Sequence, residues 1–220
     1  LSRELHSSEL PVAYAVKIPS AIIIDYQSNT TYLIDQDSDQ SRIDTILTDI
    51  ELIKPIPEEN ILGELSQENE DKFIRGVKAC LDYIVSGDVF QVNLSRQWQY
   101  KLTKEIDPAV IYHALKKANP APFSALVQYE NFSILSSSPE RLFSVQDGVL
   151  QTRPIAGTHP RGEGSEDETQ KEDLINHPKE IAEHVMLLDL ERNDMGRVCE
   201  YGSVFVNEVM TLETYPFVHQ

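Results

Sequence analysis

The 220-residue sequence predicts an α+β fold, a layered sandwich of mostly antiparallel sheets flanked by helices. Short segments of alternating apolar and polar residues, separated by turn residues, predict β-hairpins. Segments with a helical apolar period lie between these hairpins but do not follow every strand. The order of elements is therefore neither a repeated βαβ unit nor all-β.

The first part of the chain, residues 1–62, is rich in predicted strands. Apolar periodicity predicts strands for residues 12–18, 21–26 and 31–35, the last two as a hairpin. The helical spacing of apolar residues over 41–53 predicts one helix. The proline-containing segment 54–60 is the expected internal boundary, so a second part is assigned to residues 63–220.

The second part begins with a helix, for which Ser66 is the predicted N-cap and Gly87 the end. A strand over 88–96 follows, with Gln91 on its polar face. Asp107 caps the next helix, which ends at Asn119.

The rest of the second part is predicted to contain hairpins and one long helix. Strands are predicted for residues 123–129, 132–137, 142–146, 149–152 and 202–206. The pair Asp147–Gly148 favours a type I′ turn. A helix is expected over 177–193, after an acidic spacer.

Composition excludes several classes of protein. A net charge of −17 argues against nucleic acid, which demands a basic surface. The same charge repels anionic ligands, so an anion site needs local positive charge from arginines, backbone N–H groups or a metal. No apolar run is long enough to span a membrane, and the first residues do not resemble a signal peptide. Cys80 and Cys199 are too few for a disulfide framework, which leaves a reducing cytoplasm as the default.

Glu180 and Glu183 lie three residues apart near the start of the predicted helix, so their carboxylates share a face. Hard oxygen ligands of this kind suit Mg²⁺, which is often shared between carboxylates and an anionic substrate. The alternative is an exposed acidic turn, because glutamates are favoured near helix N-termini in any case.

The loop before this helix, residues 153–162, could be a structural turn or an anion site. Gly157 allows close backbone approach and Thr158 offers a hydroxyl, while Arg153 and Arg161 could clamp a carboxylate.

Three further polar residues each allow two interpretations, one functional and one structural. Glu140, at a predicted strand end, could be a general acid or a partner of Arg141. Gln91 could orient a water or substrate, or simply face solvent. His219 could face a site or lie on the surface.

Each motif alone is weak evidence for a function, but the order of the motifs resembles that in the chorismate-utilising enzymes. This family includes anthranilate synthase and aminodeoxychorismate synthase component I, isochorismate synthase and salicylate synthase. The motifs are Gly-Asp-Val-Phe-Gln-Val-Asn-Leu-Ser-Arg at 87–96, Ser-Pro-Glu-Arg at 138–141, Thr-Arg-Pro-Ile-Ala-Gly-Thr-His-Pro-Arg-Gly at 152–162, Lys-Glu-Ile-Ala-Glu-His-Val-Met-Leu-Leu-Asp-Leu-Glu-Arg-Asn-Asp at 179–194 and Gly-Ser-Val at 202–204. The resemblance is specific from about residue 66 onward and implies an α/β sandwich of antiparallel sheets flanked by helices.

The resemblance also implies roles for these residues. Glu183 matches a Mg²⁺ ligand, Glu180 would support the metal through water, and Glu140 matches the general acid for the departing C4 hydroxyl of chorismate. His219 matches the histidine near that hydroxyl. The substrate ring would lie against Ala156, Gly157 and Thr158.

The same resemblance favours ammonia over water as the nucleophile that attacks chorismate. Gln91 stands where water-adding members carry a lysine base, and a glutamine cannot activate water. Ammonia would come from a glutamine amidotransferase subunit. The motifs around Gln91, Glu140 and His219 look more like the aminodeoxychorismate branch, which feeds folate synthesis, than the anthranilate branch. Ala156 replaces a lysine that attacks the ring covalently in well-known aminodeoxychorismate enzymes, so direct ammonia addition is expected.

Later segments of the family, including further substrate and Mg²⁺ ligands, would lie beyond Gln220. We therefore expect residues 63–220 to be the N-terminal portion of the catalytic domain and the chain alone to be inactive. Two non-enzymatic alternatives are a metal- or anion-binding module and a purely structural interaction domain.

Overall fold

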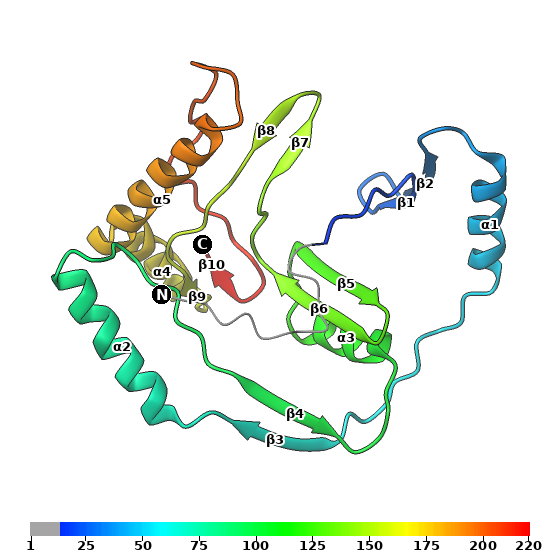
Figure 1. Cartoon of the computed structure of the whole chain (residues 1–220), viewed down its shortest axis with the longest axis horizontal. Coiled ribbons are helices and arrows are strands. Elements are labelled where there is room, and N and C mark those ends of the chain that lie inside the picture. The colour runs from blue at the N-terminus through cyan, green and yellow to red at the C-terminus, as the bar shows by residue number, and fades with distance from the viewer. Residues whose placement is uncertain (1–13) are drawn as a thin grey trace, which may run out of the picture. The chain divides into compact units, whose positions relative to one another are not determined.

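The computed structural model describes residues 14–220 (Figure 1). The chain divides into two compact units, Leu1–Pro55 and Ile56–Gln220. This division falls in the proline-containing segment 54–60.

The first unit is a hairpin followed by a helix. Strand β1 (Ser20–Asp25) pairs antiparallel with β2 (Thr30–Asp35), and α1 (Gln40–Glu51) follows. The predicted hairpin and helix are thus confirmed. Residues 12–13 of the predicted first strand lie outside the described residues, and 14–18 form no strand.

The second unit contains the remaining elements, all of whose paired strands are antiparallel. They are β3 (Gly63–Gln67), α2 (Glu70–Val85), β4 (Trp98–Leu102), α3 (Pro108–Ala118), β5 (Phe123–Tyr129), β6 (Phe132–Ser138), β7 (Ser144–Gln146), β8 (Val149–Gln151), β9 (His159–Pro160), α4 (Ser165–Asn176), α5 (Pro178–Gly196) and β10 (Val218–His219). The pairs are β3–β4, β5–β6, β7–β8 and β9–β10.

Turn and capping chemistry explains several of these boundaries. Asp147 and Gly148 both have positive φ, 52° and 77°, as a type I′ turn requires, so the β7–β8 hairpin is confirmed. The Asp107 carboxylate accepts from the Ala109 N–H and caps α3, which ends before Asn119, as expected.

In the second unit, the structure differs from the sequence predictions at four places. Ser66 is not an N-cap: it pairs with Gln99 within the β3–β4 ladder, and Asn69 caps α2 instead. Residues 88–96 and 202–206 are not strands, because neither segment finds a hydrogen-bonded partner strand among residues 14–220. Helix α4 occupies the acidic spacer, where the small number of apolar residues conceals a helical period.

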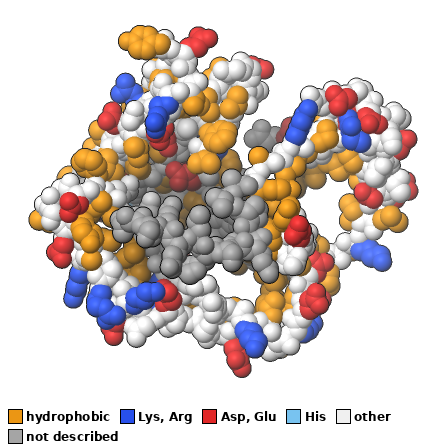
Figure 2. All heavy atoms as spheres, viewed as in Figure 1, with side chains coloured by type: hydrophobic (Ala, Val, Ile, Leu, Met, Phe, Trp, Pro, Cys, Tyr) orange, Lys and Arg blue, Asp and Glu red, His pale blue; other side chains and the backbone are white. Residues whose placement is uncertain are grey.

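Few side chains are fully buried in the described part of the chain. The buried hydrophobic residues there are Ile106, Val110 and Leu174. Figure 2 shows hydrophobic side chains spread over the visible surface, and Phe90 and Leu142 are 91% and 81% exposed. No helix among residues 14–220 has the length and apolar character needed to cross a membrane.

Candidate active site

The segment between β8 and β9 passes against the first turn of α5, where Gly157 lies close to Glu180. A Cβ placed on Gly157 would lie 2.6 Å from Glu180 Oε2 and 2.9 Å from Leu174 Cδ1. Gly157 also has φ +79°, which side-chain-bearing residues rarely adopt. Glycine is therefore required here for two independent reasons, and its small size brings the Glu180 carboxylate against the loop.

Replacing Gly157 with alanine is expected to lower the free energy of unfolding by roughly 1–3 kcal/mol, because backbone strain and the contact with Leu174 add together. The change should also displace Glu180 and weaken divalent-metal binding. Urea unfolding and metal titration check the two effects. A Gly148→Ala variant is the matched control, since Gly148 has φ +77° but nothing within 4 Å of its added Cβ.

Glu180 and Glu183 lie on one face of α5, as the spacing predicted. Their side chains are 15% and 29% exposed, so neither points into bulk solvent. The Lys179 Nζ atom lies 3.3 Å from Glu180 Oε1 and 3.5 Å from Glu183 Oε2. Hydrogen bonding to Glu180, together with the charge of both carboxylates, raises the pKa of Lys179. The two acids thus already converge on one positive group.

Gln91 reaches the same pair from a distant part of the sequence. Its Nε2 donates to Glu183 Oε1 at 3.1 Å. The sequence did not indicate this contact, which joins residues 92 positions apart.

The donor chemistry of this pair suits Mg²⁺, which prefers hard oxygen ligands. Both carboxylates can reach a shared cation, as their contacts with Lys179 show. No group of three or more His, Cys, Asp or Glu side chains suited to a metal occurs within residues 14–220. The remaining ligands of such an ion would be waters and an anionic substrate, which is how proteins commonly hold Mg²⁺.

Glu140 lies after β6 and is tied to the loop that carries Gly157. Its Oε1 accepts a hydrogen bond of 3.0 Å from the Ile155 N–H. The predicted alternative, an ion pair with Arg141, does not form. The general-acid candidate is therefore anchored two residues from the Gly157 turn.

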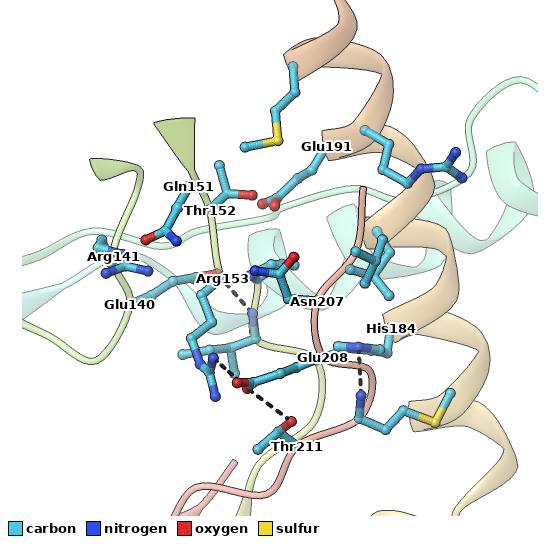
Figure 3. Close-up of a pocket in the computed structure, with 18 of the residues that line it drawn as sticks. Glu140, Arg141, Gln151, Thr152, Arg153, His184, Glu191, Asn207, Glu208 and Thr211 are labelled. Atoms are coloured by element: carbon cyan, nitrogen blue, oxygen red, sulfur yellow. Dashed lines mark hydrogen bonds and ion pairs between the residues drawn. The ribbon is translucent and has the colours of Figure 1, made fainter. Parts of the chain in front are cut away.

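A cavity of about 1380 Å³ opens beside this loop, and Glu140, Ala156, Glu180 and His184 are among the residues that line it. Figure 3 shows Glu140, Arg153 and His184 arranged around it. Three segments that are distant in sequence thus bring predicted site residues to one space. Thr158 is exposed and lies immediately before β9.

The structure pairs both arginines of the 153–162 loop with protein acids. Arg153 contacts Glu208 at 3.0 Å (Figure 3) and Glu213 at 2.7 Å. Arg161 makes two hydrogen bonds to Asp167, of 2.7 and 3.0 Å. The expectation that these arginines clamp a ligand carboxylate is therefore corrected: their charge is neutralised within the chain.

His219 belongs to a buried polar cluster. Its side chain is fully buried, with Nε2 2.8 Å from Asp167 Oδ1 and Nδ1 3.0 Å from Thr214 Oγ1. Hydrogen bonds from Arg161, and then from His219 and the Gly162 N–H, hold the pKa of Asp167 well below its usual range. Asp167 is thus ionised and can only accept, so Nε2 carries a proton. The alternative that His219 lies on the surface is therefore wrong, and its role beside a leaving hydroxyl stays a prediction.

Asp167→Asn is expected to lower the melting temperature by several degrees at about pH 7, because the charged form of Asp167 holds Arg161 and His219. The folded pKa lies below the unfolded value, so this stabilisation is present above about pH 4 and is lost as the pH falls further. The difference in melting temperature between the two proteins should therefore shrink as the pH is lowered from about 6 to about 3. A constant difference would contradict the assignment of charge to Asp167.

Comparisons with known proteins test the resemblance to the chorismate-utilising enzymes. The family described as chorismate binding enzyme matches residues 2–220. Aminodeoxychorismate synthase component 1 of Bacillus subtilis is 40% identical over 97% of this chain and 48% of that protein. Anthranilate synthase component 1 of Synechocystis is 46% identical over 71% of this chain and 32% of that protein.

A solved structure confirms the predicted fold class. Anthranilate synthase component I from Streptococcus pneumoniae superposes with a TM-score of 0.69 at 27% identity, covering 91% of this chain and 47% of that one. The chain thus spans about half the length of the relatives that match most of it.

Proposed function

This chain belongs to the family of chorismate binding enzymes, and we propose that the protein of which it forms part adds ammonia to chorismate, with Mg²⁺, to give 4-amino-4-deoxychorismate. The observation that carries the proposal is the convergence on residues 155–157. Glu140 accepts from Ile155, and Glu180 lies against Gly157. A proton donor and a metal-binding carboxylate therefore border the same stretch of backbone.

Electrostatics explains why a metal belongs in this proposal. Chorismate carries two carboxylates, and the chain has a net charge of −17. Arg153 and Arg161 are paired with acids of the chain, so a bound divalent cation would offset much of the remaining repulsion. When bound between Glu180, Glu183 and the ring carboxylate, Mg²⁺ would supply that charge and polarise the substrate.

The chain's own side chains supply binding and proton transfer. Glu140 Oε1 is held by the Ile155 N–H, so Oε2 is the oxygen that would carry the proton of a general acid. Oε2 would donate this proton to the C4 hydroxyl, which departs as water while the carbon–nitrogen bond forms. The ring would lie against Ala156, Gly157 and Thr158, where the absence of a side chain on Gly157 permits close contact.

Gln91 supports ammonia as the nucleophile. Its amide donates to Glu183, and an amide is not a base at neutral pH, so this position does not activate water. Ammonia would be supplied by a glutamine amidotransferase partner. The name of the B. subtilis relative, which includes the words component 1, is consistent with a partner subunit.

Anthranilate synthesis is the second candidate. It is favoured by Ala156, because the lysine used by well-known aminodeoxychorismate enzymes is absent there. The Synechocystis anthranilate synthase is also the more identical relative over the shorter region that it shares.

Product identification separates the two candidates. The full-length protein is given chorismate, an ammonium salt and Mg²⁺, with a matched reaction in EDTA. An amino-chorismate that keeps its enolpyruvyl ether supports the first proposal. Fluorescent anthranilate with released pyruvate supports the second. Turnover of chorismate without incorporation of nitrogen would contradict both.

A further inference from the structure

We propose that Lys179 is a built-in counter-cation: its ammonium holds Glu180 and Glu183 together when no metal is bound, and it must leave when a divalent cation binds. This inference rests on the proposed function, because it takes the two glutamates to be the metal site. Lys179 is thus a positioning residue: it holds the two glutamates and thereby sets the affinity of the site for a divalent cation.

The contacts of Lys179 carry the argument. Its Nζ lies 3.3 Å from Glu180 Oε1 and 3.5 Å from Glu183 Oε2, so one ammonium bridges both carboxylates. Within residues 14–220, no other lysine or arginine forms an ion pair with either glutamate. His177 is 4.0 Å from Glu180 and does not contact Glu183.

The two glutamates are fixed, whereas the lysine is not. Glu180 packs against Gly157, and Glu183 accepts from Gln91. Their side chains are 15% and 29% exposed, but that of Lys179 is 71% exposed. The ammonium therefore covers the pair from the solvent side on a flexible chain, and it can swing away without disturbing the carboxylates.

Charge makes the lysine and a divalent cation mutually exclusive. Two carboxylates three residues apart on a helix repel each other, and the ammonium offsets this repulsion. A divalent cation offsets it more strongly, but a cation placed between the carboxylates would repel an ammonium about 3–4 Å away. Metal binding must therefore break both ion pairs of Lys179, and this lowers the affinity of the site for the metal.

Removing the ammonium should therefore tighten metal binding. Exposed ion pairs stabilise the metal-free protein only modestly. The loss of the two pairs of Lys179 is therefore expected to lower the Mg²⁺ dissociation constant roughly 2- to 10-fold. The metal-free protein should at the same time become less stable, since the carboxylates then repel without compensation. Added Mg²⁺ should restore the melting temperature.

The test uses Lys179→Met in the full-length protein, with Mg²⁺ binding measured by calorimetric titration and stability by thermal unfolding. Lys72→Met is the matched control, because Lys72 of α2 is 68% exposed and pairs with Glu68 at 2.8 Å, far in sequence from the site. The control should leave the Mg²⁺ dissociation constant unchanged. Lys179→Gln repeats the experiment with a polar side chain of similar reach.

The outcomes separate this inference from the function on which it rests. If Glu183→Gln weakens Mg²⁺ binding but both Lys179 variants bind Mg²⁺ as the parent does or more weakly, the counter-cation role is wrong and the metal site stands. If the parent protein binds no Mg²⁺, or if Glu183→Gln leaves binding unchanged, the metal site itself is wrong and the inference falls with it.

Discussion

Glu183→Gln in the intact protein is expected to abolish Mg²⁺-dependent turnover of chorismate while leaving the fold intact. Glutamine keeps the size of the side chain, but it removes the charge that a divalent cation requires. Losing a direct ligand should weaken metal binding by more than the roughly 10–100-fold cost of losing an outer partner. Steady-state kinetics over a range of Mg²⁺ concentrations and circular dichroism check the two parts.

A matched control is Glu172→Gln, which removes one exposed acid from α4 that forms no ion pair among residues 14–220. The control changes the net charge equally, so it corrects for general electrostatics. Normal turnover of Glu183→Gln at ordinary Mg²⁺ concentrations would count against Glu183 as a metal ligand.

The second large effect is expected for Glu140→Gln. The carbonyl oxygen of glutamine can still accept from the Ile155 N–H, so the loop should keep its position. The amide has no transferable proton, and kcat should fall about 10²- to 10⁴-fold, the usual contribution of a general acid. The dissociation constant for chorismate, measured by titration in the presence of Mg²⁺, should change little.

Two results would argue against this role for Glu140. An unchanged kcat would exclude proton donation by this side chain. A lost affinity for chorismate together with a reduced kcat would show that Glu140 shapes the site instead of supplying the proton.

Local signals predicted most of the elements. The pair Asp147–Gly148 gave the β7–β8 hairpin because its turn requires two residues with positive φ. Asp107 with Pro108 predicted the start of α3 because both favour a helix N-terminus. These features depend on a few neighbouring residues, which a single sequence contains.

Features that depend on distant partners could not be predicted in the same way. Residues 88–96 alternate like a strand, but a strand also needs a partner edge, and none lies among residues 14–220. Helix α4 has little apolar periodicity, and its buried Asp167 is explained by partners outside the helix, Arg161, Gly162 and His219.

In the candidate site, too, features set by neighbouring residues were predicted and contacts with distant residues were not. The three-residue spacing of Glu180 and Glu183 fixed their common face. Their neighbours come from far away in the chain, as with Gln91, and no local pattern indicated that contact. The charge of Arg153 was visible in the sequence, but its neutralisation by Glu208 and Glu213 was not.

The most direct measurement is a calorimetric titration of the full-length protein with chorismate, at increasing Mg²⁺ concentrations and in EDTA. Two sites that share one bridging ion must strengthen each other equally, so Mg²⁺ should raise the affinity for chorismate, and chorismate should raise the affinity for Mg²⁺ by the same factor. Chorismate that binds equally well in EDTA would contradict the account, because a negative protein would then hold a doubly negative ring without the bridging cation.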